Sequence, residues 1–91
     1  MIYVGIDVEK DKHDCFIVNL DGEVLHDVFT IQNNMAGFKD LLFKIKSAEP
    51  NPDKVKVGLE ATGHYSCNIL GFLKRMGLTT IEINPLYTCL L

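Results

Sequence analysis

The feature that most limits how this chain can fold is a pattern that occurs twice. The segments IYVGIDV, near the N-terminus, and VKVGLEA, in the second half, each alternate apolar residues with others and carry a glycine two residues before an acid. Alternate residues of a strand lie on the same face of a sheet. Each segment therefore predicts a strand with one apolar face and, on the other face, the pair Gly5 and Asp7 or the pair Gly58 and Glu60.

The remaining segments predict the order strand, strand, strand, helix, strand, helix, strand. Asp21-Gly22 predicts a type I′ hairpin turn between the second and third strands, because both residues tolerate positive φ. The short segment Glu9–Lys12 suits another hairpin connection, so the first three strands are expected to form an antiparallel meander. The expected strands are Ile2–Val8, His13–Leu20, Glu23–Ile31, Val55–Glu60 and Thr79–Ile83.

Two amphipathic helices are expected between the later strands. The first has Asn33 or Asn34 as its N-cap and ends at the segment EPNP, because proline cannot continue a helical hydrogen-bond ladder. The second begins directly after Glu60 and stops at Gly77, which suits a left-handed helix end. Their apolar stripes are Met35, Phe38, Leu41, Leu42 and Ile45, and Tyr65, Ile69, Phe72, Leu73 and Met76.

The length of the chain favours a single domain, residues 1–91. A strand–helix–strand connection within one sheet is normally a right-handed parallel crossover, so the last two strands should run parallel. If the fourth strand pairs with the first, as in the ribonuclease H architecture, the strand order is 3-2-1-4-5. The predicted fold is an α/β fold, with a mixed five-stranded sheet and flanking helices.

The two acids are candidate metal ligands. If their strands are parallel neighbours, Asp7 and Glu60 emerge at the same C-terminal edge of the sheet, where ligands of α/β folds usually bind. Two adjacent carboxylates repel unless a cation lies between them, and Mg²⁺ suits carboxylate, water and phosphate oxygens. The free amide groups at the start of the next helix can bind phosphate, and that start holds Thr62, Gly63, His64 and Tyr65.

Simpler roles remain open for each of these residues. Asp7 and Glu60 can cap turns, and His64 can donate a hydrogen bond at the helix start without contacting a ligand. Tyr65 belongs to the apolar stripe, and Thr62 can be the N-cap of the helix. Residue types alone leave both sets of roles possible.

Charge and hydropathy give broader limits. The formal net charge of −3 argues against a stand-alone nucleic-acid binder, which is usually basic. The sequence shows no basic-plus-apolar leader and no apolar run long enough to cross a membrane. A cytoplasmic protein without membrane contact is therefore expected.

Several motifs together resemble a known family. They are the segments GIDVEKDKHD and VGLEATGHY, and also GFKDLL, LKRMG and INPL. In these segments the chain resembles the N-terminal part of the DEDD transposases of the insertion-sequence 110 family. The resemblance covers nearly the whole chain. It implies a RuvC-like, ribonuclease H-type catalytic domain that coordinates Mg²⁺ through four acids, of which Asp7 matches the first and Glu60 the second.

The resemblance also implies an activity and partners. The family carries out Mg²⁺-dependent DNA strand cleavage and transfer in DNA transposition and recombination, guided by a structured RNA that the mobile element encodes. Its members act as dimers or tetramers, so a homo-oligomer in the bacterial cytoplasm, associated with the nucleoid, is expected. Lys10 and the Thr62–Tyr65 segment are the expected nucleic-acid contacts.

One departure from the family limits the expected activity. The family's last two acids form an Asp-x-x-Asp pair downstream of the Asn-Pro segment, and the 91 residues end at Leu91 without it, which suggests a shortened reading frame. Two carboxylates hold Mg²⁺ weakly, so little or no DNA cleavage by this fragment is expected. Glu82 and Asp11 are the nearest substitutes, although solvent exposure of Glu82 and turn closure by Asp11 are the simpler expectations. One uncovered sheet face should promote a dimer, which a free strand edge could also form.

Two other functions compete with this hypothesis. The actin-like sugar kinases also begin with a Gly-Ile-Asp strand and a hairpin, but they need a small Gly-Thr-Thr-type turn where this chain has Glu9–Lys12. An ATP-binding phosphotransferase therefore remains an alternative. The second is a non-catalytic remnant that self-associates or binds nucleic acid without chemistry.

Overall fold

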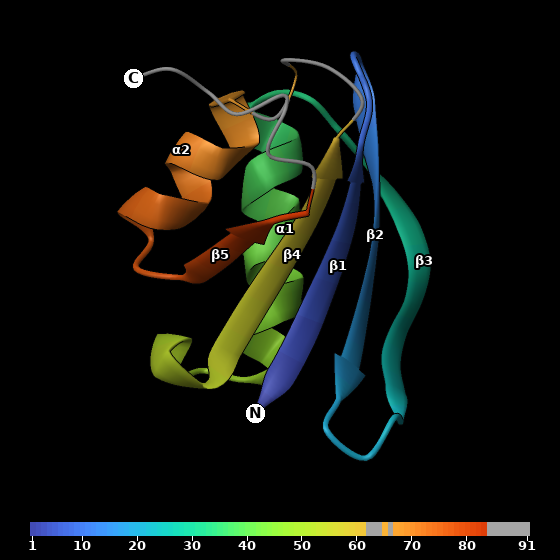
Figure 1. Ribbon diagram of the computed structural model, residues 1–91, viewed down its shortest axis with the longest axis vertical. Helices are drawn as coiled ribbons and strands as arrows, with labels where there is room; N and C mark the ends of the chain where they lie inside the picture. The colour runs from blue at the N-terminus through green and yellow to red at the C-terminus, as the bar shows by residue number, and fades with distance from the viewer. Residues whose placement is uncertain (62–64, 66, 84–91) are drawn as a thin grey trace.

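The computed structural model describes residues 1–61, 65 and 67–83, which form one sheet and two α-helices (Figure 1). A single 3-10 turn, η1, precedes the fourth strand. The elements in chain order are β1 (Ile2–Val8), β2 (Lys12–Asn19), β3 (Val24–Gln32), α1 (Met35–Ala48), η1 (Pro52–Lys54), β4 (Val55–Ala61), α2 (Cys67–Arg75) and β5 (Thr79–Glu82).

The sheet has the strand order β3-β2-β1-β4-β5. β1 pairs with β2, and β2 with β3, in antiparallel fashion, while β4 lies parallel to both β1 and β5. The predicted mixed sheet with the order 3-2-1-4-5 is therefore confirmed, and this order fits a ribonuclease H-like sheet. β5 is parallel to β4 because the crossover helix α2 returns the chain in its original direction. β4 is parallel to β1 because α1 returns the chain in the direction of β3, which runs parallel to β1 across the meander.

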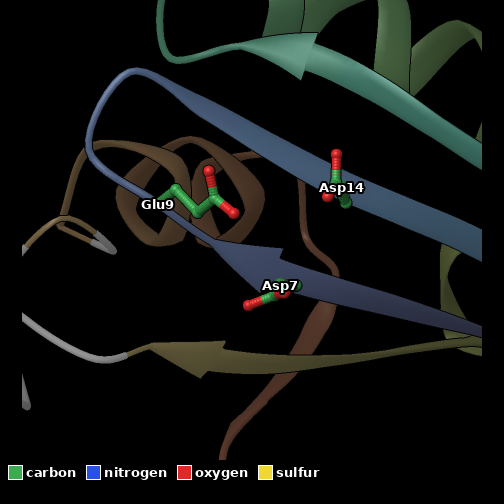
Figure 2. A group of neighbouring side chains, drawn as sticks. All are labelled: Asp7, Glu9 and Asp14. Atoms are coloured by element: carbon green, nitrogen blue, oxygen red, sulfur yellow. The ribbon is translucent and has the colours of Figure 1, made fainter.

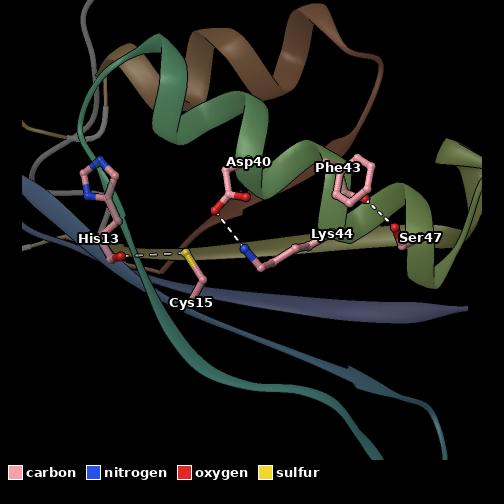
Figure 3. Close-up of polar contacts among 6 residues, drawn as sticks. All are labelled: His13, Cys15, Asp40, Phe43, Lys44 and Ser47. Atoms are coloured by element: carbon pink, nitrogen blue, oxygen red, sulfur yellow. Dashed lines mark hydrogen bonds and ion pairs between the residues drawn. The ribbon is translucent and has the colours of Figure 1, made fainter.

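Both helices pack against the same face of the sheet, as Figure 3 shows for α1 and α2. Alternate residues of β1 and β4 point toward them, because side chains of a strand alternate between its two faces. The helices contribute most of the stripes that amphipathic periodicity predicts, but Met35, Tyr65 and Met76 are exposed. The buried core includes Val4, Ile6, Val8, Ile17, Val57 and Leu59 from the sheet and Phe38, Leu41, Ile45, Ile69, Phe72 and Leu73 from the helices.

The first helix begins and ends as local chemistry requires. Asn34 is its N-cap, and the Asn34 side chain accepts a hydrogen bond of 2.9 Å from the Gly37 amide. The helix ends at Ala48, before Pro50. Met35, expected in the apolar stripe, is 46% exposed, whereas Gly37 and Phe38 in the same turn are buried.

The second helix starts later than predicted. β4 extends through Ala61 and α2 begins at Cys67, so Tyr65 lies in a turn and is 43% exposed. Thr62, Gly63 and His64 lie outside the described residues. The predicted helix end is confirmed, since Gly77 has a φ of 78°. Neither described helix has the length and apolar character that a membrane crossing requires.

The turn between β2 and β3 also differs from the prediction. A type I′ turn needs positive φ at both central residues, but Gly22 has a φ of 80° and Asp21 does not have a positive φ. The Asn19 side chain explains the difference, because its Oδ1 accepts hydrogen bonds from the amides of Asp21 and Glu23. The Gly22 amide donates to the Asn19 carbonyl, so the turn is built around Asn19.

Candidate functional site

The face of the sheet opposite the two helices is open and hollowed. A cavity of about 370 Å³ lies on it. Its apolar lining includes Tyr3, Phe16, Val28 and Ile83. The acids Asp7, Asp14 and Glu60 also line this cavity.

The glycines of the repeated pattern make room for two aromatic rings on this face. Gly5 and Gly58 are direct partners in the parallel pairing of β1 with β4. A Cβ atom on Gly5 would overlap the ring of Phe16, and one on Gly58 would overlap the hydroxyl of Tyr3. The two rings therefore lie close against the backbone, with their centroids 6.1 Å apart. This close approach of side chains is the physical reason for glycine at both positions.

The two predicted acids lie side by side in the sheet. Asp7 on β1 and Glu60 on β4 are direct partners in the parallel register, and both side chains are exposed. Their neighbours Ile6 and Leu59 face the core at 3% and 1% exposure, so both acids lie on the open face. The predicted placement at the C-terminal ends of neighbouring parallel strands is therefore observed, while the role of each acid as a ligand stays a prediction.

The described residues contain a cluster of three carboxylates, Asp7, Glu9 and Asp14 (Figure 2). One ligand atom from each lies within 4.8 Å of the others. Asp14 faces Asp7 directly across the antiparallel pairing of β1 with β2, and the Thr30 hydroxyl donates a hydrogen bond of 2.7 Å to Asp14. Glu60 is not in this cluster. Its oxygens must move closer if it is to share one ion with all three.

Sequence reasoning did not single out Glu9 or Asp14. The signal was available, since a hairpin with its connection at Glu9–Lys12 places the residue after His13 opposite Asp7. Side chains that face each other across an antiparallel pair lie about 4.5–5.5 Å apart at Cβ. The register of the hairpin, rather than any spacing motif, would have identified Asp14.

The turn that carries Glu9 and Lys10 is fixed from a distant part of the chain. The Asn33 side-chain amide donates to the Lys10 carbonyl at 2.8 Å, and the Asn33 backbone amide donates to the Asp11 carbonyl at 3.0 Å. The Glu9 amide donates to the Lys12 carbonyl at 3.1 Å. The backbone of Lys10, an expected nucleic-acid contact, is therefore held beside the acids while its side chain is exposed.

His13 supports this turn from the core side of the sheet. Its side chain is fully buried and stacks on Phe38, with ring centroids 6.3 Å apart. Burial lowers the pKa of His13, although the nearby Asn33 side chain partly offsets that effect. Nδ1 accepts a hydrogen bond from the Glu9 amide at 3.3 Å, which requires that nitrogen to be unprotonated. The neutral imidazole therefore helps to shape the turn beside the acid cluster.

The other residues considered for the site lie apart from it. Glu82 pairs with Leu59 in the β4–β5 register, which places it, half-buried, on the helix-covered face. It therefore lies on the opposite side of the sheet from Asp7. Asp11 is exposed in the β1–β2 turn, as turn closure predicts. Tyr65 is described but forms no part of a buried stripe.

Solved structures with similar folds come from several functional classes. A protein of unknown function with an actin-like ATPase fold from Bacteroides thetaiotaomicron has a TM-score of 0.71 and 22% identity, covering 96% of this chain and 34% of its own. A ROK family glucokinase from Streptomyces griseus has a TM-score of 0.54 and 16% identity, and the match covers 92% of this chain and 33% of the glucokinase. Archaeoglobus fulgidus Pelota has a TM-score of 0.59 and 16% identity, and the match covers 91% of this chain and 26% of Pelota. At these identities the likeness shows the fold alone, and this chain spans about a third or less of the structures that it matches.

The sequence itself matches one family. No protein of curated function matches the chain. The family model described as a transposase, of the DEDD type of insertion-sequence 110, matches residues 4–88, which include both acids of the repeated pattern. The match spans nearly all of the 91 residues. The chain therefore belongs to the DEDD transposases of the insertion-sequence 110 family.

Proposed function

We propose that this chain is the N-terminal part of a transposase catalytic domain, in which Asp7 and Glu60 are two of the acids for Mg²⁺-dependent DNA strand cleavage and transfer. The single observation that carries the proposal is the direct pairing of Asp7 with Glu60 on the open sheet face of a chain from this family. The resemblance implies that the complete protein uses a guide RNA and acts at the nucleoid. Lys10 and the Thr62–Tyr65 segment are proposed to contact nucleic acid.

The chemistry of the acids fits a hard divalent cation. Asp7, Glu9 and Asp14 offer carboxylate oxygens within 4.8 Å of one another, and such oxygens are the ligands that Mg²⁺ prefers. The Thr30 hydroxyl holds Asp14 in place. Asp7 of this cluster would hold the metal together with its register partner Glu60, whose oxygens must first move closer, and the metal would supply charge stabilisation for phosphoryl transfer. The open face leaves room beside them for a phosphate group.

The chain by itself is proposed to be catalytically inactive. Its sequence contains no Asp-x-x-Asp after Asn84-Pro85. A Mg²⁺ ion at Asp7 and Glu60 would keep most of its water ligands and bind weakly. The chain is thus proposed to fold and to bind metal, without completing the reaction.

Metal binding can be tested without any activity. Mn²⁺, a paramagnetic substitute for Mg²⁺, can be titrated into the protein while electron paramagnetic resonance reports the free ion. Asp7→Asn and Glu60→Gln are each expected to weaken binding about tenfold, whereas Glu82→Gln, on the opposite face of the sheet, should have no effect. Equal losses in all three variants would refute the site.

Catalysis needs a separate assay. Incubation of the chain with supercoiled DNA and Mg²⁺ is expected to give no nicked product. Nicking that disappears in Glu60→Ala would refute the proposed inactivity and show a complete centre. A chain that neither nicks DNA nor binds Mn²⁺ would instead favour the non-catalytic remnant.

Self-association is proposed to use the open face of the sheet and not the β3 edge. Phe16, Val28 and Ile83 on the cavity are 38%, 67% and 56% exposed, so a second copy could bury their apolar surface. The β3 edge is a poor partner because its register shifts opposite Phe16, between Cys15 and Ile17. The Asp27 carboxylate also accepts a hydrogen bond of 2.8 Å from the Val28 amide, so this amide is not free to pair with another strand.

Sedimentation velocity tests this dimer. The wild-type chain is expected to sediment as a dimer at high concentration, and Val28→Lys as a monomer. Leu20→Lys is the matched control, since Leu20 is 74% exposed in the distant β2–β3 turn. A wild-type monomer at high concentration, or a Val28→Lys dimer, would contradict the proposal.

An ATP-dependent phosphotransferase is the second candidate, favoured by the fold likeness to an actin-like ATPase fold and to a glucokinase. The charge of the β1–β2 turn opposes it. Glu9 lies within 4.8 Å of Asp7 and Asp14, where a nucleotide phosphate would need a small, uncharged turn. Calorimetric titration with Mg-ATP should show no binding, and tight binding would favour the kinase-like function.

A further inference from the structure

The two helices carry a charge opposite to that of the rest of the chain. α1 and α2 contain five basic residues and one acid, a formal charge of +4. All other residues together contain four basic and eleven acidic side chains, a formal charge of −7, which gives the −3 of the whole chain. Because the helices pack on the face opposite Asp7 and Glu60, the basic layer and the acidic site lie on different sides of the sheet.

An exposed aromatic residue lies within this basic layer. Lys39, Phe43 and Lys46 occupy positions i, i+4 and i+7 of α1, which share one side of a helix. Phe43 is 72% exposed, and both lysines are exposed. The inner side of the same helix is already filled by its buried residues, Gly37, Phe38, Leu41 and Ile45. Phe43 therefore contributes nothing to the core, and we call these three residues the Lys-Phe-Lys stripe.

The positive charge of the Lys-Phe-Lys stripe is not neutralised within the described part of the chain. The acid of α1, Asp40, is paired with Lys44 at 2.8 Å (Figure 3). Glu49, just beyond the helix, lies 3.8 Å from the N-terminal amine. Neither Lys39 nor Lys46 has an ion pair with any described residue. Both charges are therefore available to an anionic partner.

We propose that the Lys-Phe-Lys stripe of α1 binds a single-stranded segment of DNA, with Phe43 stacking on one unpaired base and Lys39 and Lys46 contacting phosphates on either side. The seven-residue separation of the lysines spans about 10 Å of helix, with the aromatic ring between them. An aromatic side chain stacks on an unpaired base at no unstacking cost, whereas insertion into a duplex must first open a base step, which favours a single strand over a duplex. DNA is chosen because the chain belongs to a transposase family. The inference rests on the proposed function for that choice, and its surface is separate from the acids.

The stacking contact is tested by fluorescence anisotropy with a labelled 20-nucleotide oligothymidine, at low salt and with EDTA present. Phe43→Ala is expected to weaken binding about tenfold, within the range of 1–3 kcal/mol for one stacked base. Leu20→Ala is the control, because Leu20 is a 74% exposed apolar residue in the distant β2–β3 turn. Equal effects of the two substitutions would overturn the proposed stacking contact. Circular dichroism confirms that each variant is folded.

The phosphate contacts are tested through the salt dependence. Lys39→Ala/Lys46→Ala should weaken binding and reduce the slope of log affinity against log salt by about 1.4, or about 0.7 for each phosphate that is no longer neutralised. Lys54→Ala/Lys56→Ala removes the same charge from two exposed lysines outside α1 and α2 and should change the slope much less. Equal changes in both double variants would show only a general charge effect and overturn the proposal.

Two further comparisons identify the ligand. A duplex of the same length should bind more weakly and without dependence on Phe43, and tighter duplex binding would overturn the single-strand assignment. Oligouridine that binds more tightly than oligothymidine would overturn the assignment to DNA. Because these assays contain EDTA, they do not depend on metal binding at Asp7 and Glu60. A failure of the metal site and a failure of the Lys-Phe-Lys stripe would therefore be distinguished.

Discussion

The two faces of the sheet differ although the same strands build both. On the helix-covered face, Val4, Ile6, Val57 and Leu59 are between 0% and 3% exposed. On the open face, the residues between them are glycines, a tyrosine, a lysine and the two acids. The first face consists of side chains that fill space, and the second places backbone, aromatic rings and carboxylates next to a cavity.

This difference shows how a small domain can separate stability from function within one strand. Because side chains alternate, residues adjacent in sequence have unrelated environments. Burial of the first set supplies most of the favourable free energy of folding. The second set is free to carry charge, since it is not enclosed in the core. Four experiments can sharpen or break this contrast.

The largest effect is expected from neighbouring residues on opposite faces of β4. Leu59→Ala should lower the free energy of unfolding by about 2–5 kcal/mol, because the Leu59 side chain is only 1% exposed and its removal leaves a cavity in the core. Glu60→Ala should change it by about 0.5 kcal/mol or less, because that side chain is exposed. Urea unfolding followed by circular dichroism measures both. Similar values would break the contrast between the faces.

Two helical glycines test how closely the helix layer packs. A Cβ on Gly37 would overlap the backbone carbonyl of Gln32, so Gly37→Ala should destabilise the fold by about 1–3 kcal/mol. Gly71, in α2, has open space around its Cβ position among the described residues. Gly71→Ala should therefore stabilise by about 0.5–1 kcal/mol, as expected for replacing glycine inside a helix. Thermal unfolding of both variants would show shifts of opposite sign.

His13, on the helix-covered face, makes the free energy of unfolding depend on pH. Its pKa is lowered by burial, so the folded state binds this proton less readily than the unfolded state. The stabilising contribution is complete above the unfolded pKa of about 6.5 and is lost as pH falls from there toward the folded pKa. Urea unfolding between pH 5 and 8 should show this decrease.

The histidine that causes the decrease can be identified with two variants. His13→Leu should remove most of the decrease, whereas His26→Leu, at a half-buried position of β3, should retain it. If His13→Leu does not fold, an NMR titration of the His13 ring in the wild-type chain serves instead. A His13 pKa at or above 6.5 would refute the explanation.

The smallest effect is expected on the outer surface of the helix layer. Lys44 pairs with Asp40 four residues earlier and lies 4.8 Å from the Phe29 ring centroid, but both charged groups are partly exposed. A double-mutant cycle of Lys44→Ala with Asp40→Ala should give a coupling of about 0.3–0.5 kcal/mol. Added salt should reduce it. A coupling above about 1 kcal/mol would mean that this pair is less hydrated than its exposure suggests.

Most of the fold could be predicted from local sequence patterns. The repeated strands, the α1 stripe apart from Met35, and the Gly77 stop depend on neighbouring residues, and the structure confirms them. Of the two predicted caps of α1, Asn33 and Asn34, the structure shows Asn34. The errors occurred where a side chain replaced a backbone interaction or where an element ran past its expected end. Asn19 reshaped the predicted type I′ turn, and β4 ran on to Ala61, so that α2 began only at Cys67.

The candidate site was only half predictable. Asp7 and Glu60 could be paired in advance only by assuming the ribonuclease H-like order, in which the fourth strand lies parallel beside the first. Asp14 was missed although the predicted β1–β2 hairpin implies its register, and the Thr30 contact that holds it depends on β3 as well. The hydrogen bonds of Asn33 to the turn join residues more than twenty positions apart, which no local pattern encodes.

The sequence by itself determined which residues of each strand are apolar and which carry charge, because that alternation is a property of the chain. Right-handed crossovers in the strand order 3-2-1-4-5 already put both helices on one face of the sheet. Only the tertiary structure decided which carboxylates meet on the other face and how the rings of Tyr3 and Phe16 lie against the backbone there. The physical reason is that these contacts depend on strand register and on side-chain packing in space, and periodicity alone specifies neither.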